Sequence, residues 1–180
     1  MEFIYETIEF NKSLPIKIFI HSVNYVQNHW HNSMELLFIL SGKVNIVIDS
    51  VSYELREEDV LLINSNEIHA ISSKESNTIL ALQIPMEFIK ANFDEPGEIK
   101  FNCKSFCKNG EEQYPYNSIR NILAKMMWVY SKNESGFVLK LQSLLFDMIY
   151  ILFRNFNVSK QDEKNTLKYL ERLSRISIFS

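Results

Sequence analysis

The sequence predicts a mainly β fold, in which antiparallel strands close into a barrel, followed by an α-helical hairpin. Up to about residue 101 the apolar residues come in short runs separated by turn signals, whereas from about residue 116 they recur every three or four residues. The chain has 180 residues, 46% of them hydrophobic and 13% aromatic, which is sufficient for a substantial core. Many short strands without a long helix between them are typical of a sandwich or a barrel, and a barrel also removes exposed strand edges.

The first half contains short candidate strands, several of them rich in Ile, Val and Phe. They cover residues 3–10, 16–23, 34–40, 44–48, 52–55, 60–63, 68–72, 78–84 and 99–102. Ser41 and Gly42 lie between two of these strands, and Asp49 and Ser50 lie between the next two. We expect both pairs to form tight hairpin turns that join antiparallel neighbours.

The second half predicts two amphipathic helices, at about 117–130 and 136–155, joined by the polar loop 131–135 into an antiparallel hairpin. The shared face of the first carries Ile119, Ile122, Leu123, Met126, Met127 and Tyr130, and that of the second carries Val138, Leu141, Leu144, Leu145, Met148, Ile149 and Leu152. Because the second apolar stripe is wide, we expect it to contribute to self-association.

These patterns divide the chain into three parts. We expect a barrel over 1–112, a helical hairpin that mediates dimerisation over 113–156, and a polar linker that leads into the start of a helix over 157–180. Near the last residue, Ile176, Ile178 and Phe179 are apolar but have no following segment to pack against. We therefore expect the chain to be a piece of a longer protein.

The charge and cysteine content exclude several classes of protein. With 19 Lys and Arg against 22 Asp and Glu, the net charge is −3, so no overall positive field attracts nucleic acid. Two cysteines, Cys103 and Cys107, are too few for a disulfide framework, and no secretion signal opens the chain, which predicts a cytoplasmic protein. The cysteines could form a thiol or metal pair, but burial as small apolar residues is favoured. The apolar runs are too short to span a membrane, so we predict no membrane partner.

The segment HWHNSMELLFILSG, residues 29–42, contains the candidate site. In an extended strand His29 and His31 share one face, whereas Trp30 points to the other face and packs under the helices or in an outer core. Glu35 follows, and a return strand could bring His69 across from the segment EEDVLLINSNEIH. Three imidazoles and a carboxylate can hold a divalent transition-metal ion with open coordination positions. The same groups could instead hydrogen-bond sugar hydroxyls or an anionic group without any ion.

The spacing of His29, His31, Glu35 and Gly42 resembles the first cupin motif, and the segment from Glu58 to His69 resembles the second. The four ligand positions are present, but four turn positions differ: the glycines of the second motif fall at Glu58 and Asn66 and its proline at Asn64, and the opening glycine of the first falls at Val23. Over about residues 1–175 the sequence is similar to the sensor domains of AraC/XylS-family transcription regulators.

The resemblance implies a double-stranded β-helix that binds a small-molecule effector, a sugar or a related metabolite, at His29, His31, Glu35 and His69. It further implies a homodimer that is not an enzyme and that contacts DNA only through a following C-terminal domain with two helix-turn-helix motifs. No cofactor is required, but a divalent ion such as Zn, Ni, Mn or Fe could bind the same four residues. Two alternatives stay open: a metal-dependent cupin enzyme, either a dioxygenase or an isomerase, and a purely structural dimerisation module.

Overall fold

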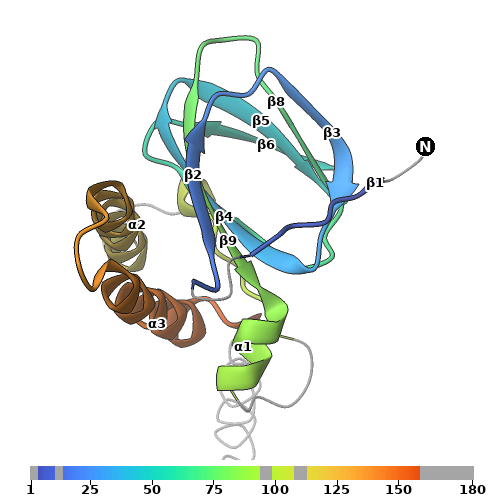
Figure 1. The fold of residues 1–180 in the computed structure, drawn as a ribbon. Coiled ribbons are helices and arrows are strands. Elements are labelled where there is room, and N and C mark those ends of the chain that lie inside the picture. Colours follow the sequence, from blue (N-terminus) through green and yellow to red (C-terminus); the bar gives the residue numbers. More distant parts are fainter. Residues whose placement is uncertain (1–3, 11–13, 94–98, 108–112, 159–180) are drawn as a thin grey trace, which may run out of the picture.

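The computed structural model describes residues 4–10, 14–93, 99–107 and 113–158. Two β-sheets face each other to form a barrel, and two long helices cover the outer face of one sheet (Figure 1). This architecture confirms the predicted fold class. The expected linker and third helix over 157–180 lie, beyond residue 158, outside the described residues.

One sheet has the order β1-β3-β8-β5-β6 and the other has the order β2-β9-β4-β7. The strands are Ile4–Tyr5 (β1), Lys17–His21 (β2), Tyr25–Trp30 (β3), Ser33–Ser41 (β4), Lys43–Ile48 (β5), Val51–Arg56 (β6), Val60–Ile63 (β7), His69–Ser72 (β8) and Thr78–Pro85 (β9). From β2 to β9 the chain changes sheet at every connection except the β5–β6 hairpin. Pairing is antiparallel except between β1 and β3. This alternation is the topology of a double-stranded β-helix.

The two predicted hairpin turns have different outcomes. Asp49 and Ser50, with φ of 46° and 72°, join β5 to β6 as expected. The prediction was wrong for Ser41 and Gly42, because β4 and β5 belong to opposite sheets. Gly42 instead forms a corner between the sheets with φ of +75°, where a Cβ would collide with the backbone carbonyl oxygen of Ser76. Only glycine fits both the conformation and the space.

Three other elements differ from the sequence predictions. Strand β3 was not among the candidate strands, because its polar, partly exposed sequence YVQNHW lacks an apolar run. The expected strand over 99–102 is absent among its described residues except for one bridge between Phe101 and Asn157. The side chain of Asn64 accepts from the N–H of Phe101 (2.8 Å) and donates to its carbonyl oxygen (3.1 Å), so a side chain replaces a strand partner there. The short helix Met86–Asn92 (α1), which continues from β9, was also not predicted.

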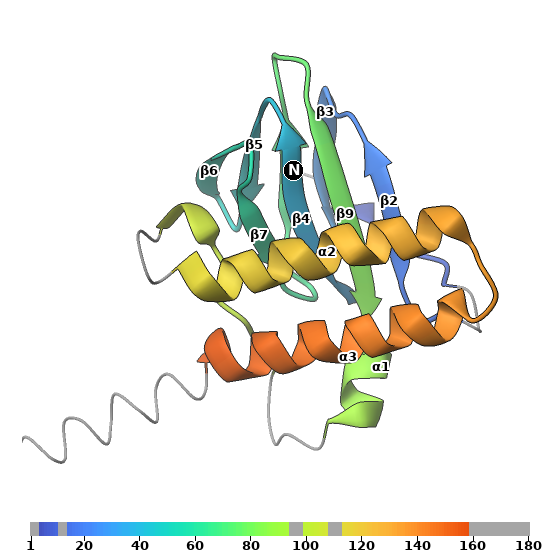
Figure 2. The same cartoon turned by 90° about the vertical axis from the view of Figure 1, so that its left-hand side faces the viewer.

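Helices Tyr114–Lys132 (α2) and Phe137–Asn155 (α3) confirm the predicted hairpin. They run antiparallel across the outer face of the sheet formed by β2, β9, β4 and β7 (Figure 2). In the second predicted stripe every residue except Val138 is buried, so these residues form core rather than a free surface. Tyr130 was expected on the apolar face of the first helix but is 42% exposed. None of the described helices has the length and hydropathy of a membrane span.

Two cores lie on opposite faces of the helix-covered sheet. On β4, Leu37 and Ile39 point into the barrel, whereas Met34 and Leu36 point outward to the helices. Both faces of β4 are therefore buried, which explains why its sequence MELLFIL is apolar at every position except Glu35 instead of alternating with polar residues. Glu35, which points into the barrel, is the one charged residue in this strand, and it is buried.

Candidate metal and effector site

A cluster of buried polar side chains occupies one end of the barrel interior. In one sheet His29 of β3 pairs with His69 of β8, and in the opposite sheet Glu35 of β4 pairs with Gln83 of β9. The connection between β3 and β4 adds His31. His29 is 8% exposed, and the other four are no more than 5% exposed. Residues from four strands and one connection thus meet in one place.

The three imidazole rings of His29, His31 and His69 face one another. The ring centroid of His69 lies 4.1 Å from that of His29 and 5.0 Å from that of His31, and the centroids of His29 and His31 are 5.9 Å apart. One nitrogen from each ring lies within 4.8 Å of the other two. These three buried histidines form a group that could hold a metal ion.

Each histidine of the cluster is oriented by a backbone carbonyl. The Nδ1 atoms of His29, His31 and His69 lie 2.9, 3.0 and 2.9 Å from carbonyl oxygens of residues 27, 33 and 67, respectively. Because a carbonyl oxygen only accepts, each Nδ1 is the nitrogen that carries the proton, and the lone pair of each neutral ring lies on Nε2. Outer-sphere hydrogen bonds of this kind fix the ring orientation of metal-binding histidines.

Glu35 lies against the Nε2 atoms of two of these rings. Its Oε2 atom is 3.2 Å from Nε2 of His31 and 3.4 Å from Nε2 of His69, and its Oε1 accepts from Nε2 of Gln83 at 3.3 Å. The His69 contact is close enough for an ion pair but is not a hydrogen bond, so Nε2 of His69 is buried without a hydrogen-bond partner among the described residues. Two acceptors that face each other are matched by a cation between them. The donor set of three imidazoles and one carboxylate therefore fits a divalent transition-metal ion.

The interaction between Glu35 and His31 shifts their pKa values in the direction opposite to the shift that burial causes. Burial disfavours the charged forms of Glu35 and His31, but the hydrogen bond between them outweighs it, so the pKa of the Glu35 carboxyl lies well below its usual value and the pKa of His31 is raised. The pKa of His29 is lowered by burial and by the nearby charge of His69. Without metal, the proton is thus favoured on His31, where a divalent ion would compete with it.

Two further polar atoms in the barrel are buried without a hydrogen-bond partner among the described residues: Oε1 of Gln83 and Nδ1 of His21. His21 lies on β2, and burial lowers the pKa of its imidazole. Buried polar atoms normally have a partner in the protein, in water or in a ligand. An acceptor on Gln83 and a polar nitrogen on His21 therefore suit a ligand with hydroxyl or amine groups.

The structure brings together all four predicted site residues, His29, His31, Glu35 and His69. The sequence reasoning did not single out Gln83. It could have been found, because Gln83 is the one polar inward residue that alternates with the inward Ile79 and Ala81 of β9.

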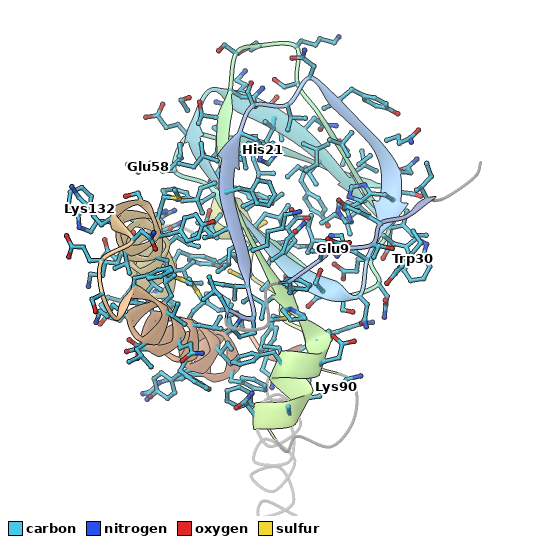
Figure 3. All side chains as sticks on the ribbon, viewed as in Figure 1. Glu9, His21, Trp30, Glu58, Lys90 and Lys132 are labelled. Carbon is cyan, nitrogen blue, oxygen red and sulfur yellow. The ribbon has the colours of Figure 1, made fainter. Side chains whose placement is uncertain are left out.

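Other residues singled out in the sequence lie away from the cluster. Trp30 packs on Tyr5 of β1, with ring centroids 4.6 Å apart, at the side of the barrel remote from the helices (Figure 3). Of the two expectations for Trp30, packing under the helices was therefore wrong, and the partly buried ring packs on the outer side of its own sheet. Cys103 is buried as expected, and burial raises the pKa of its thiol, but Cys107 is exposed. The two cysteines do not form a buried pair.

Larger hollows lie at the helices rather than at the histidines. One of about 470 Å³ lies between α2 and α3, and one of about 500 Å³ lies between β2 and the α2–α3 connection. Neither is lined by a residue of the cluster. A hollow of about 130 Å³ does adjoin the cluster and is lined by His31 together with Tyr5, Glu6, Ile8 and Phe10, among others. The candidate site is therefore identified by its buried polar side chains and not by the volume of the hollow beside it.

Several solved structures are similar to this chain. A cupin superfamily protein from Desulfitobacterium hafniense is 26% identical, with 43% of this chain and 74% of that chain covered and a TM-score of 0.39. A cupin-2 domain-containing protein from Shewanella frigidimarina is 18% identical, with 43% and 74% covered and a TM-score of 0.38.

A curated relative and a family model match the sequence directly. An uncharacterized HTH-type transcriptional regulator, YdeC of Bacillus subtilis strain 168, is 29% identical over 83 residues, which are 42% of this chain and only 28% of that regulator. Residues 18–149 match the model of the AraC-like ligand binding domain. That match covers the barrel from β2 onward and most of the helical hairpin. The chain therefore belongs to the family of AraC-like ligand binding domains.

Proposed function

We propose that this domain is the effector-sensing unit of a transcription regulator, and that its effector binds at a divalent metal ion held by His29, His31, His69 and Glu35. The observation that carries the proposal is the common orientation of three imidazoles. Their Nδ1 atoms are held by backbone carbonyls, and two of their Nε2 atoms lie within 3.4 Å of one carboxylate oxygen. A bound ion would offer open coordination positions to an oxygen or nitrogen of the effector.

The effector that fits this site best is a small polar molecule, a sugar or a related metabolite. Gln83 contributes an acceptor oxygen without a partner among the described residues, and His21 contributes a polar nitrogen in the same barrel. Phe19, whose ring centroid lies 5.0 Å from that of His21, adds an aromatic surface beside it. Such a mixture of aromatic and hydrogen-bonding groups is suited to a polyhydroxylated ligand.

Effector binding changes regulation only if the effector binds one arrangement of the regulator more tightly than another. We propose that this differential affinity acts on the helical hairpin, which packs on the strands that carry Glu35 and Gln83. DNA would be contacted by a separate helix-turn-helix domain of a longer regulator. Metal-dependent enzyme chemistry at the same four residues is the alternative.

The proposal predicts metal-dependent stabilisation of the purified domain. We expect about one divalent ion per chain by elemental analysis, and we expect a chelator to lower the melting temperature. A panel of sugars and related metabolites should raise the melting temperature of the metal-loaded protein, because a ligand at 100 times its Kd stabilises the native state by about 2.7 kcal/mol. Protein that neither retains nor responds to Zn, Ni, Mn or Fe would contradict the metal assignment. Turnover of a panel compound by the loaded protein would favour the enzyme.

We also propose that the domain forms a homodimer through α3. Leu139, Phe146 and Tyr150 are 72%, 43% and 57% exposed and share the helix face opposite the buried stripe. Solvent-exposed apolar residues in one row are typical of a helix that packs on a partner.

The α3 interface predicts that L139E converts a dimer to a monomer in sedimentation equilibrium, because it places a charge within an apolar contact. K125E, which changes an exposed residue of α2, is the matched control and should remain dimeric. A monomeric parent protein, or an L139E variant that associates as tightly as the parent, would contradict this interface.

A further inference from the structure

The N-terminal segment 4–10, here called the arm, runs from beside β3 toward β2 across one side of the barrel (Figure 1). It pairs with β3 through Ile4 and Tyr5 and then continues in extended form. Its side chains alternate: Glu6, Ile8 and Phe10 are partly buried, whereas residues 7 and 9 are exposed. The arm therefore presents one face to the barrel, and the carboxylate of Glu6 lies on this face.

The carboxylate of Glu6 is directed at the histidine cluster. Its Oε2 atom lies 3.5 Å from Nε2 of His29, and its backbone N–H donates to the carbonyl oxygen of Trp30 at 2.9 Å. Glu35 contacts the Nε2 atoms of His31 and His69 from the other sheet. Each of the three Nε2 atoms therefore lies within 3.5 Å of a carboxylate oxygen, which belongs to Glu6 for His29 and to Glu35 for His31 and His69.

When the His29 ring is neutral, no proton lies between its Nε2 and the Glu6 carboxylate. Nδ1 of His29 donates to the carbonyl oxygen of Gln27, so the facing Nε2 of the neutral ring is an acceptor, like the carboxylate. An exposed ion pair would in any case contribute little, because the Glu6 side chain is 44% exposed. A cation placed between the two acceptors would make the contact favourable.

The arm is held to the barrel by few interactions. Strand β1 has two residues, Ile4 and Tyr5, which are 45% and 50% exposed. Beyond them the arm lies over a hollow of about 130 Å³, lined by Glu6, Ile8, Phe10 and His31 among others. Elements with few buried contacts open at low free-energy cost, so one additional bond to the arm changes its population of docked states measurably.

We propose that Glu6 is a second carboxylate of the metal site, delivered by the arm, so that metal binding and docking of the arm are coupled. The inference rests on the proposed metal site. By linkage, the factor by which the ion favours the docked arm equals the factor by which the docked arm favours the ion. The arm then reports the occupancy of the barrel on the surface of the domain.

The test combines E6Q with a matched control in the same arm. E6Q keeps the size of the side chain but removes its charge, and E9Q makes the same change at an exposed arm residue. We expect the Kd for Zn²⁺ alone, measured by competition with a chromogenic chelator, to rise about 10-fold in E6Q and to stay unchanged in E9Q. Zn²⁺ should slow backbone hydrogen exchange of the arm about 10-fold in the parent and in E9Q, but not in E6Q.

The outcomes separate this inference from the function on which it rests. If the parent binds Zn²⁺ but E6Q binds it equally tightly, or if Zn²⁺ leaves hydrogen exchange of the parent arm unchanged, the role of Glu6 is wrong while the metal site stands. If the parent binds no Zn²⁺, both are wrong. Equal weakening of binding in E6Q and E9Q would show a general charge effect and would also overturn the specific role of Glu6.

Discussion

Replacement of His31 with alanine is expected to weaken binding of Zn²⁺ by at least about 100-fold, since loss of an outer-sphere partner alone typically costs 10- to 100-fold. His31 combines three roles in the cluster: its Nε2 lies 3.2 Å from Glu35, its ring faces both other histidines, and its Nδ1 is fixed by Ser33. Zn²⁺ affinity by chelator competition, followed with and without a candidate effector, measures the loss.

Two further variants make the His31 result interpretable. H21A removes an imidazole from the same barrel but outside the three-histidine group, and its Zn²⁺ affinity should match that of the parent. H31A removes the hydrogen bond to Oε2 of the buried Glu35, whose Oε1 still accepts from Gln83, and this loss destabilises the metal-free fold by about 1–3 kcal/mol. The double variant H31A/E35Q removes that buried charge and should recover part of the stability but none of the affinity. Parent-like affinity in H31A would place the metal elsewhere.

Replacement of Gly42 with alanine is expected to destabilise the fold by about 4 kcal/mol, which is near the upper end of the range for single substitutions. Two causes act together. The φ of +75° costs alanine about 1–2 kcal/mol, and the new Cβ would collide with the backbone carbonyl oxygen of Ser76, which cannot move as a side-chain end would. Equilibrium unfolding in urea measures the difference in free energy of unfolding.

Gly136 offers the matched control for the corner at Gly42. Its φ is +82°, but no atom lies within 4 Å of the Cβ that alanine would add. G136A should therefore lose only the conformational part, about 1–2 kcal/mol. Equal losses in the two variants would show that the collision at the β4–β5 corner is relieved by a backbone shift.

The sequence predicted the barrel and the helical hairpin because period and turn composition are local signals. It did not distinguish a hairpin from a corner at Gly42, because a Ser-Gly pair suits either, and only the pairing of β4 with β7 and β9 decides between them. Strand β3 was missed because pairing rather than a run of apolar side chains holds it, whereas the strand expected over 3–10 is found only at Ile4–Tyr5 among its described residues.

The four predicted site residues could be found because their spacing resembles a known motif. Gln83 and Glu6 were missed because they come from β9 and from the arm, which approach the cluster only through tertiary structure. The substituted glycine positions are also informative. Glu58 and Asn66 retain φ of 69° and 65°, so the backbone of the second motif keeps its left-handed turns without glycine.

The alternation along β4 has a mechanical consequence. Glu35 faces the histidine cluster inside the barrel, while its neighbours Met34 and Leu36 belong to the core shared with α2 and α3. A single peptide unit therefore separates Glu35 from each of two residues that pack against the helical hairpin. A movement of β4 that displaces Glu35 would also displace Met34 and Leu36, so the strand itself links the interior of the barrel to the helices outside it.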